Sequence, residues 1–219
     1  MHQPLVSLDR VSKLFGRFAA LREVSAAFDR GRLYAILGEN GAGKSTLLRV
    51  IAGLARPTSG EVTWPDAKPQ IGYMAHASML YDELSGMENL RYFASLYGIH
   101  SDATLVAGLE RVGLDPQLTR RVDAYSQGMC QRLSLARALF CEPELLLLDE
   151  PFSNLDPASG GEITKLLGTL RDSGKTVLVV THQIGYVDDI ADESFMMSRG
   201  AIVSRRSGAA AIEREVLEQ

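Results

Sequence analysis

The sequence has few cysteines, no long apolar run and no excess of positive charge. Its two cysteines, Cys130 and Cys141, lie eleven positions apart, which indicates two reduced thiols rather than a disulfide or a metal pair. Apolar runs such as Leu145 to Leu148 and Val177 to Val180 are too short to cross a bilayer. The first residues lack the apolar stretch of a secretory signal, so we expect a cytoplasmic protein.

The charge balance is acidic, with 23 Lys and Arg residues against 27 Asp and Glu residues and a formal net charge of −4. Nucleic-acid binding needs a basic surface to neutralise phosphates, so no nucleic-acid partner is expected. The 219 residues suffice for one large domain, or for a core with a subdomain.

A glycine-rich stretch lies between an apolar segment, residues 32–37, and a helix-like segment, residues 47–52. It matches the phosphate-binding P-loop, whose glycines let successive backbone N–H groups point at phosphate oxygens. Its lysine adds charge for the terminal phosphates, and its serine hydroxyl is placed to ligate Mg²⁺. The stretch consists of Gly38, Glu39, Asn40, Gly41, Ala42, Gly43, Lys44, Ser45 and Thr46. The sequence therefore predicts a nucleotide-phosphate site.

Strand-like and helix-like segments alternate along the chain, which predicts an α/β fold with a mainly parallel sheet covered on both faces. Short strands are expected over residues 5–36. A change to helical periodicity near residue 80 indicates a helical insertion. We expect its first helix to begin with a capping box of Ser85 and Glu88, and a later helix to be capped by Asp156.

An acidic pair, Asp149 and Glu150, ends the apolar strand that begins at Leu145, and His182 follows the next apolar strand. Ligands of open α/β sheets bind beyond the carboxyl ends of the strands, so these side chains and the P-loop are expected to meet. Asp149 would hold Mg²⁺ and Glu150 would act as general base on water. Alone, such a pair often caps the next helix, and a lone histidine is more often structural.

Two aromatic residues, Phe15 and Phe18, lie in an expected loop region between the first strands. Either ring could stack on a base, because aromatic faces bind π-systems without sequence-specific chemistry. The competing interpretation is that both rings pack inside the small β layer.

Taken in order, these motifs resemble the ATP-binding subunit of ATP-binding-cassette (ABC) transporters, over about residues 5–205. The ordered set comprises Walker A at residues 38–46, a signature-like segment at residues 125–129, Walker B at residues 145–149 followed by Glu150, a D-loop at residues 153–156, and the switch His182. The resemblance implies a P-loop NTPase of ABC type: a mainly parallel core, a small antiparallel β layer and an inserted helical subdomain.

The resemblance also implies how the parts divide and what they bind. We expect a single domain over residues 1–219. Its nucleotide-binding core takes about 1–79 and 138–205, its helical subdomain about 80–137, and a tail helix 206–219. The implied cofactors are ATP and Mg²⁺. The implied partners are a second copy, facing head to tail, and an integral membrane permease that docks near residues 76–90. The protein would lie peripherally at the cytoplasmic face of the membrane.

Individual residues acquire roles from the same resemblance. Phe15 occupies the position of the aromatic residue that stacks on adenine, while Ser126 and Gly128 would contact ATP bound to the opposite subunit. Two departures accompany this. Only Ser126 and Gly128 match the usual Leu-Ser-Gly-Gly-Gln signature, and His76 stands where a Q-loop glutamine is usual. His76 would sense Mg²⁺ and the attacking water with a weaker metal contact.

The chain is also similar to the heme-exporter ATPases of cytochrome c maturation and to exporter ATPases of the multidrug or polysaccharide type. The leading hypothesis is an ATPase that drives export through a membrane subunit. The alternatives are a soluble ABC ATPase acting on ribosomes or nucleic acid, and a nucleotide-gated module without turnover. The presence of Glu150 and His182 argues against the last.

Overall fold

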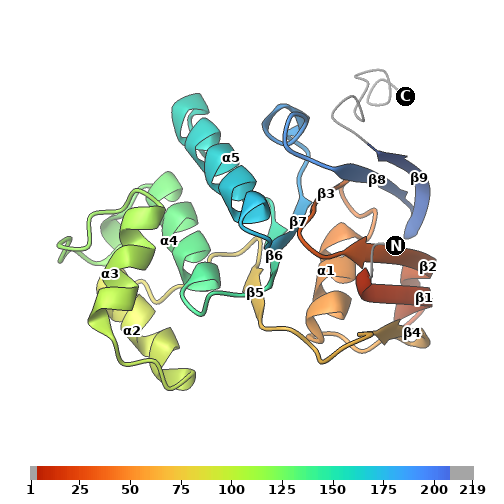
Figure 1. Cartoon of the computed structure of the whole chain (residues 1–219), viewed down its shortest axis with the longest axis horizontal. Coiled ribbons are helices and arrows are strands. Elements are labelled where there is room, and N and C mark those ends of the chain that lie inside the picture. The colour runs from red at the N-terminus through yellow and green to blue at the C-terminus, as the bar shows by residue number, and fades with distance from the viewer. Residues whose placement is uncertain (1–3, 208–219) are drawn as a thin grey trace.

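The computed structural model describes residues 4–207 and contains two sheets (Figure 1). The larger has six strands in the order β5-β6-β7-β3-β8-β9. Neighbouring strands from β5 to β8 are parallel, and β9 pairs antiparallel with β8. The strands are β3 (Leu33–Gly38), β5 (Ile71–Met74), β6 (Leu145–Asp149), β7 (Thr176–Val180), β8 (Glu193–Ser198) and β9 (Ala201–Ser207). The predicted mainly parallel core is confirmed.

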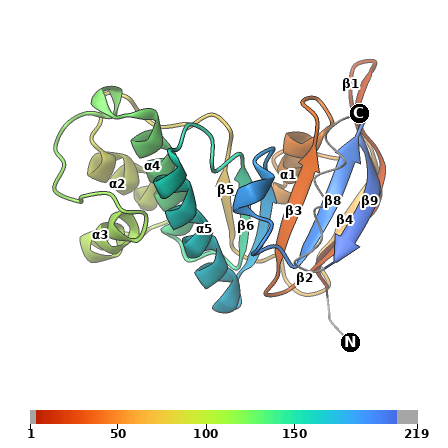
Figure 2. The same ribbon diagram turned by 90° about the horizontal axis from the view of Figure 1, so that it is seen from above.

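The smaller sheet is antiparallel, in the order β2-β1-β4. Its strands are β1 (Pro4–Phe15), β2 (Phe18–Asp29) and β4 (Ser59–Thr63). This is the predicted β layer, and its first two strands are longer than the short strands expected from the sequence. It lies at the opposite end of the molecule from α2 and α3 (Figures 1 and 2).

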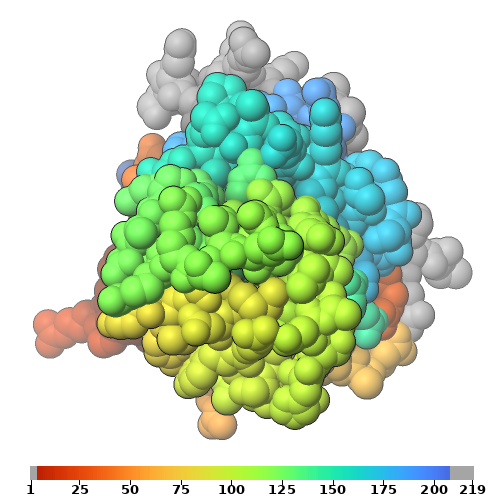
Figure 3. All heavy atoms as spheres, turned by 90° about the vertical axis from the view of Figure 1, so that its left-hand side faces the viewer, coloured from red at the N-terminus to blue at the C-terminus, as the bar shows by residue number. Residues whose placement is uncertain are grey.

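Five α-helices complete the described fold: α1 (Lys44–Ala52), α2 (Gly86–Leu96), α3 (Asp102–Arg111), α4 (Gln127–Leu139) and α5 (Pro157–Asp172). A 3₁₀ turn, η1 (Val122–Ala124), precedes α4, and a second, η2 (Ile184–Tyr186), lies between β7 and β8. Helices α2 to α4 gather at one end, and Figure 3 shows this end covered by the yellow and green residues of the insertion. The expected helix over residues 206–219 falls outside the described residues, except that Arg206 and Ser207 end β9.

The core has two parts because the central strands are buried on both faces. Strands β6 and β7 are buried at every position, as their unbroken apolar sequences require in a parallel sheet. Alternate residues point to opposite faces. Leu146 and Leu148 join a cluster with the helices of the insertion and α5, whereas Leu145 and Leu147 join one with α1 and the β layer.

Helix starts follow the capping residues in the sequence. Ser85 accepts a hydrogen bond from the backbone N–H of Glu88, whose carboxylate accepts one from the N–H of Ser85. Asp156 accepts hydrogen bonds from the N–H groups of Ala158 and Ser159, with Pro157 in the first turn of α5. Both predicted caps are confirmed. Within residues 4–207, no helix combines the length and hydrophobicity that a membrane span requires.

Candidate functional site

The P-loop joins β3 to α1 and needs glycine at two positions. At Gly38 φ is 142° and at Gly43 it is 102°. A Cβ at Gly38 would lie 2.2 Å from the carbonyl oxygen of Met197, and a Cβ at Gly43 would lie 2.4 Å from that of Ala20. Neither backbone contact can be relieved by rotating a side chain, so larger residues are excluded. The loop is thereby held with the N-terminus of α1 directed at its concave side.

The P-loop forms one wall of a cavity of about 770 Å³. This size is typical of small-molecule sites. The lining residues are Phe18, Ala20, the whole stretch from Gly38 to Thr46, His76, Asp149, Glu150, Val180 and His182. The structure therefore brings the predicted P-loop, acidic pair and two histidines to one place, beyond the carboxyl ends of β3, β6 and β7.

Lys44 is buried and its ammonium is turned toward the P-loop backbone. Its Nζ donates hydrogen bonds to the carbonyl oxygens of Gly38 and Glu39, at 2.6 and 2.9 Å. Burial lowers the pKa of Lys44 from its ordinary value, and the carboxylates of Glu150 and Asp149 act in the opposite direction. The site thus concentrates one positive and two negative groups in a partly dehydrated space.

Asp149 ends β6 and is only 1% exposed. Burial raises its pKa, while a hydrogen bond with Ser45 and the nearby His76 lower it. Its Oδ2 atom is one of two buried side-chain polar atoms in residues 4–207 that have no hydrogen-bond partner. A free carboxylate oxygen beside a serine hydroxyl is a donor set that suits Mg²⁺, which prefers oxygen ligands and takes few from protein.

Glu150 has an unusual backbone conformation, with φ of 56°. For a residue with a side chain this left-handed conformation costs about 1–2 kcal/mol. Its N–H donates to the carbonyl oxygen of Val180 at 2.8 Å. Its Oε2 lies 3.0 Å from Nδ1 of His182 and accepts a hydrogen bond from that residue's N–H at 3.4 Å. Strain held in place by hydrogen bonds is characteristic of functional residues.

Of the other site residues predicted from the sequence, some line the cavity and others lie outside it. His76 lines the cavity. Phe18 also lines it, whereas Phe15 does not and is 53% exposed, with Nζ of Lys13 5.1 Å from its ring centre. Phe15 and Phe18 are paired across the β1–β2 hairpin. The motif position could not distinguish them, because which ring faces the cavity depends on the turn and register of that hairpin.

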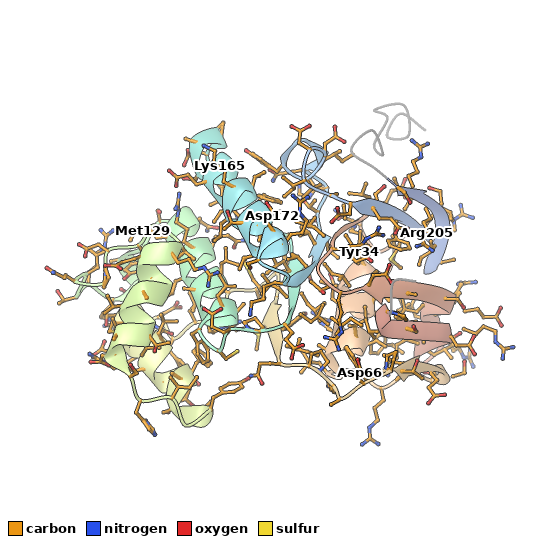
Figure 4. The ribbon with its side chains drawn as sticks, viewed as in Figure 1. Tyr34, Asp66, Met129, Lys165, Asp172 and Arg205 are labelled. Atoms are coloured by element: carbon orange, nitrogen blue, oxygen red, sulfur yellow. The ribbon has the colours of Figure 1, made fainter. Side chains whose placement is uncertain are left out.

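Ser126 and Gly128 do not belong to that cavity lining. Ser126 caps α4, where its Oγ accepts a hydrogen bond from the N–H of Met129 at 3.2 Å. Figure 4 places Met129 at the helical end of the molecule, far from Tyr34 and Arg205 at the sheet end. A Cβ at Gly128 would lie 3.4 Å from Leu155, so this helix start packs beside the loop that follows β6.

One contact in the site was not anticipated from the sequence. Gln131 on α4 donates a hydrogen bond to the backbone carbonyl oxygen of Glu150. A glutamine within an amphipathic helix gives no signal of such a contact, since the acceptor is a main-chain atom 19 residues further along the chain.

Comparison with known proteins decides the family. The model of the family described as ABC transporter matches residues 21–153. The chain belongs to the ABC transporter family. Like other ATP-binding cassettes it hydrolyses ATP. It is 35% identical over 199 residues to the ABC transporter ATP-binding protein NatA of Bacillus subtilis, covering 85% of this chain and 81% of NatA.

Other relatives of this ABC protein are transport and export ATPases. It is 31% identical over 205 residues to the lantibiotic transport ATP-binding protein SrtF of Streptococcus pyogenes, covering 91% of this chain and 89% of SrtF. It is 37% identical over 195 residues to a fluoroquinolones export ATP-binding protein of Mycobacterium tuberculosis, covering 84% and 64%. None of these is named as a heme exporter, so the narrower expectation of cytochrome c maturation is not supported by these relatives.

Solved structures confirm the predicted ABC fold. The chain superposes with a TM-score of 0.85 and 28% identity on the ATP-binding cassette MJ0796, in a dimeric post-hydrolysis state bound to ADP and Pi. That match covers 92% of this chain and 98% of MJ0796.

Proposed function

We propose that this ABC protein is the ATP-hydrolysing subunit of an exporter and drives transport by a separate membrane subunit. The observation that carries the proposal is that the cavity is lined by some of the predicted ATP-binding residues and not by others. It gathers the P-loop, Asp149, Glu150 and His182, while Ser126 and Gly128 stand outside it. One chain thus presents half of an ATP site on each of two surfaces.

Different residues of the chain have different roles in phosphoryl transfer. The P-loop N–H groups and Lys44 bind and orient the phosphates, and Glu150 accepts a proton from the attacking water. His182, whose Nδ1 lies 3.0 Å from Oε2 of Glu150, holds that carboxylate and would contact the terminal phosphate. Ser45 and Asp149 would hold Mg²⁺, which when bound neutralises phosphate charge. His76, which also lines the cavity and lies near Asp149, would sense Mg²⁺ and the attacking water.

The completed site requires a second copy. In a head-to-tail dimer, ATP on the P-loop of one subunit would meet Ser126 and Gly128 of the other, at the N-terminus of α4. The dimeric state of MJ0796 supports this arrangement. The base would stack on an aromatic ring of the β1–β2 hairpin, for which Phe18 is the candidate because it lines the cavity and Phe15 does not.

A second hollow, of about 340 Å³, supports docking of a membrane subunit near residues 76–90. It lies between the core and the insertion. Its lining includes Leu54, Met79, Phe93, Tyr97 and Arg137. Leu54, Met79 and Tyr97 are each about 60% exposed or more, an arrangement that favours burial against an apolar partner. The protein would thus sit peripherally at the cytoplasmic face of the membrane.

The cargo class follows from the relatives alone. They carry out lantibiotic, fluoroquinolone and bacitracin transport by their names, which favours a drug or peptide over heme. The alternative of a soluble ABC ATPase acting on ribosomes or nucleic acid is not favoured, because the chain is acidic overall and its relatives are transport proteins.

Purification from detergent-extracted membranes tests this proposal. The tagged wild-type chain should bring down a multispanning membrane protein, and that complex should hydrolyse ATP faster than the isolated chain. Tyr97→Glu, which charges the hollow, should lose the partner and the stimulation. Val203→Glu charges an equally exposed apolar position on β9 and should keep both. Stoichiometric RNA or DNA in place of a membrane protein would contradict the proposal.

A further inference from the structure

Gln131 is the side chain that joins the helical insertion to the peptide of Glu150. Its Nε2 donates to the Glu150 carbonyl oxygen at 2.6 Å, across the boundary between α4 and the end of β6. The side chain is partly buried, so the hydrogen bond is shielded from competing water. None of the roles described above uses this contact.

The Glu150 peptide is held from several directions. Its N–H is bonded to Val180 and its carbonyl also accepts from the N–H of Ser153 at 3.2 Å. Because φ is 56°, the backbone is in a conformation that a residue with a side chain rarely adopts, and outside contacts must maintain it. That conformation is what brings the carboxylate to His182. Gln131 is therefore one of the groups that hold the peptide of Glu150 in this conformation.

The same helix carries the surface proposed to meet the second nucleotide. Ser126 caps α4 five residues before Gln131, which is about 7.5 Å along a helix axis. Gly128, between them, packs beside Leu155 and Asn154, in the loop that follows Glu150. The first turns of α4 thus contact the catalytic loop of their own subunit and present Ser126 outward.

We propose that Gln131 is a positioning residue for hydrolysis, which transmits the placement of α4 to the Glu150 carboxylate. When Ser126 engages the partner's ATP, α4 is fixed, and through Gln131 the Glu150 peptide is fixed with it. The inference rests on the proposed function, because it takes Glu150 as the base and Ser126 as the contact to the opposite nucleotide.

Replacement of the amide by groups of similar length tests the inference. Gln131→Met keeps the volume and removes the donor. It should lower kcat by about tenfold to a hundredfold, as expected when a general base is misdirected. The KM for ATP and the Kd for ATP should not change. Gln131→Lys restores a donor and should recover part of kcat. Gln117→Met makes the same chemical change at an exposed position of the insertion and should behave as wild type.

A second measurement separates positioning from assembly. In the Glu150→Gln background, Gln131→Met should leave ATP-dependent dimer formation intact. Three results would overturn the inference alone: a wild-type kcat in Gln131→Met, a parallel loss of kcat and ATP affinity, or no advantage of Gln131→Lys over Gln131→Met. A wild-type chain that hydrolyses no ATP would overturn the proposed function, and this inference with it.

Discussion

At the scale of single residues, the burial of ionised groups in the site lowers the stability of the folded chain. Burial is the main influence on both Asp149 and Lys44, and it disfavours the charged form of each. For Asp149 the pKa in the folded chain is above the ordinary 3.8. At a pH between 3.8 and the pKa of Asp149 in the folded chain, this carboxyl is protonated more in the folded chain than in the unfolded chain. The free energy of unfolding therefore falls as pH rises through this range.

Asp149→Asn should therefore stabilise the chain when neither nucleotide nor Mg²⁺ is present. At pH 7 the free energy of unfolding should rise by about 1 kcal/mol or more, because the negative charge of a buried carboxylate is removed. The advantage should shrink as pH falls and vanish well below 3.8, where Asp149 is protonated in both the folded and the unfolded chain. Urea unfolding of the variant and the wild type across this pH range measures the difference in their free energies of unfolding.

The matched control is Asp189→Asn, which changes an exposed carboxylate and should leave the free energy of unfolding at pH 7 unchanged. A destabilised Asp149→Asn chain at pH 7 would contradict the account of Asp149. The same variant should lose the stabilisation that Mg²⁺ and ATP together give to the wild type.

The site residues that belong to a sequence motif could be predicted from the sequence. Those whose place in the site depends on the three-dimensional fold could not. Asp149, Glu150 and His182 follow buried strands, so the topology of a parallel sheet was enough to bring them to one cavity. The position of Phe18 in the cavity depends on the register of a hairpin, and the contact of Gln131 with Glu150 depends on where α4 lies. No local sequence pattern encodes either of these. The roles of all these residues stay predictions.

At the scale of elements, α2 and α3 offer a matched pair of helix starts. Both are preceded by serine, Ser85 and Ser101. Ser85 makes a complete capping box with Glu88, whereas Ser101 makes no side-chain cap hydrogen bond. The Ser85 N–H and hydroxyl hold the pKa of Glu88 below its ordinary value, so this contribution is lost as acid protonates the carboxylate.

Ser85→Ala should lower the free energy of unfolding by about 1 kcal/mol, since it removes the cap of α2. Ser101→Ala should cost much less, because no hydrogen bond is lost. Chemical denaturation of the two variants measures the difference. Equal losses would show that the capping box does not stabilise this helix start.

Element positions were predictable where the sequence carries a stop or start signal. Asp156 followed by Pro157 marked the start of α5, and the unbroken apolar stretches marked β6 and β7. The extent of β1 and β2 was not predictable. Their pairing contains several register shifts, which break the alternation of apolar and polar residues on which strand prediction depends.

At the scale of the whole molecule, the residues proposed to form the two halves of an ATP site do not line one cavity. Ser126, at the start of α4, is outside the lining of the P-loop cavity. The central claim is that they meet between subunits. ATP would then act as part of the interface, favouring the closed dimer until ATP is hydrolysed and the cleaved phosphate leaves the site.

The most direct test is the mass of Glu150→Gln in solution at saturating ATP and Mg²⁺, measured by light scattering. The account predicts a stable dimer with ATP, a monomer with ADP, and a monomer for Glu150→Gln combined with Ser126→Asp. Aspartate keeps the cap of α4 but places a negative charge against the partner's phosphate. A Glu150→Gln chain that binds ATP and remains a monomer would contradict the central claim.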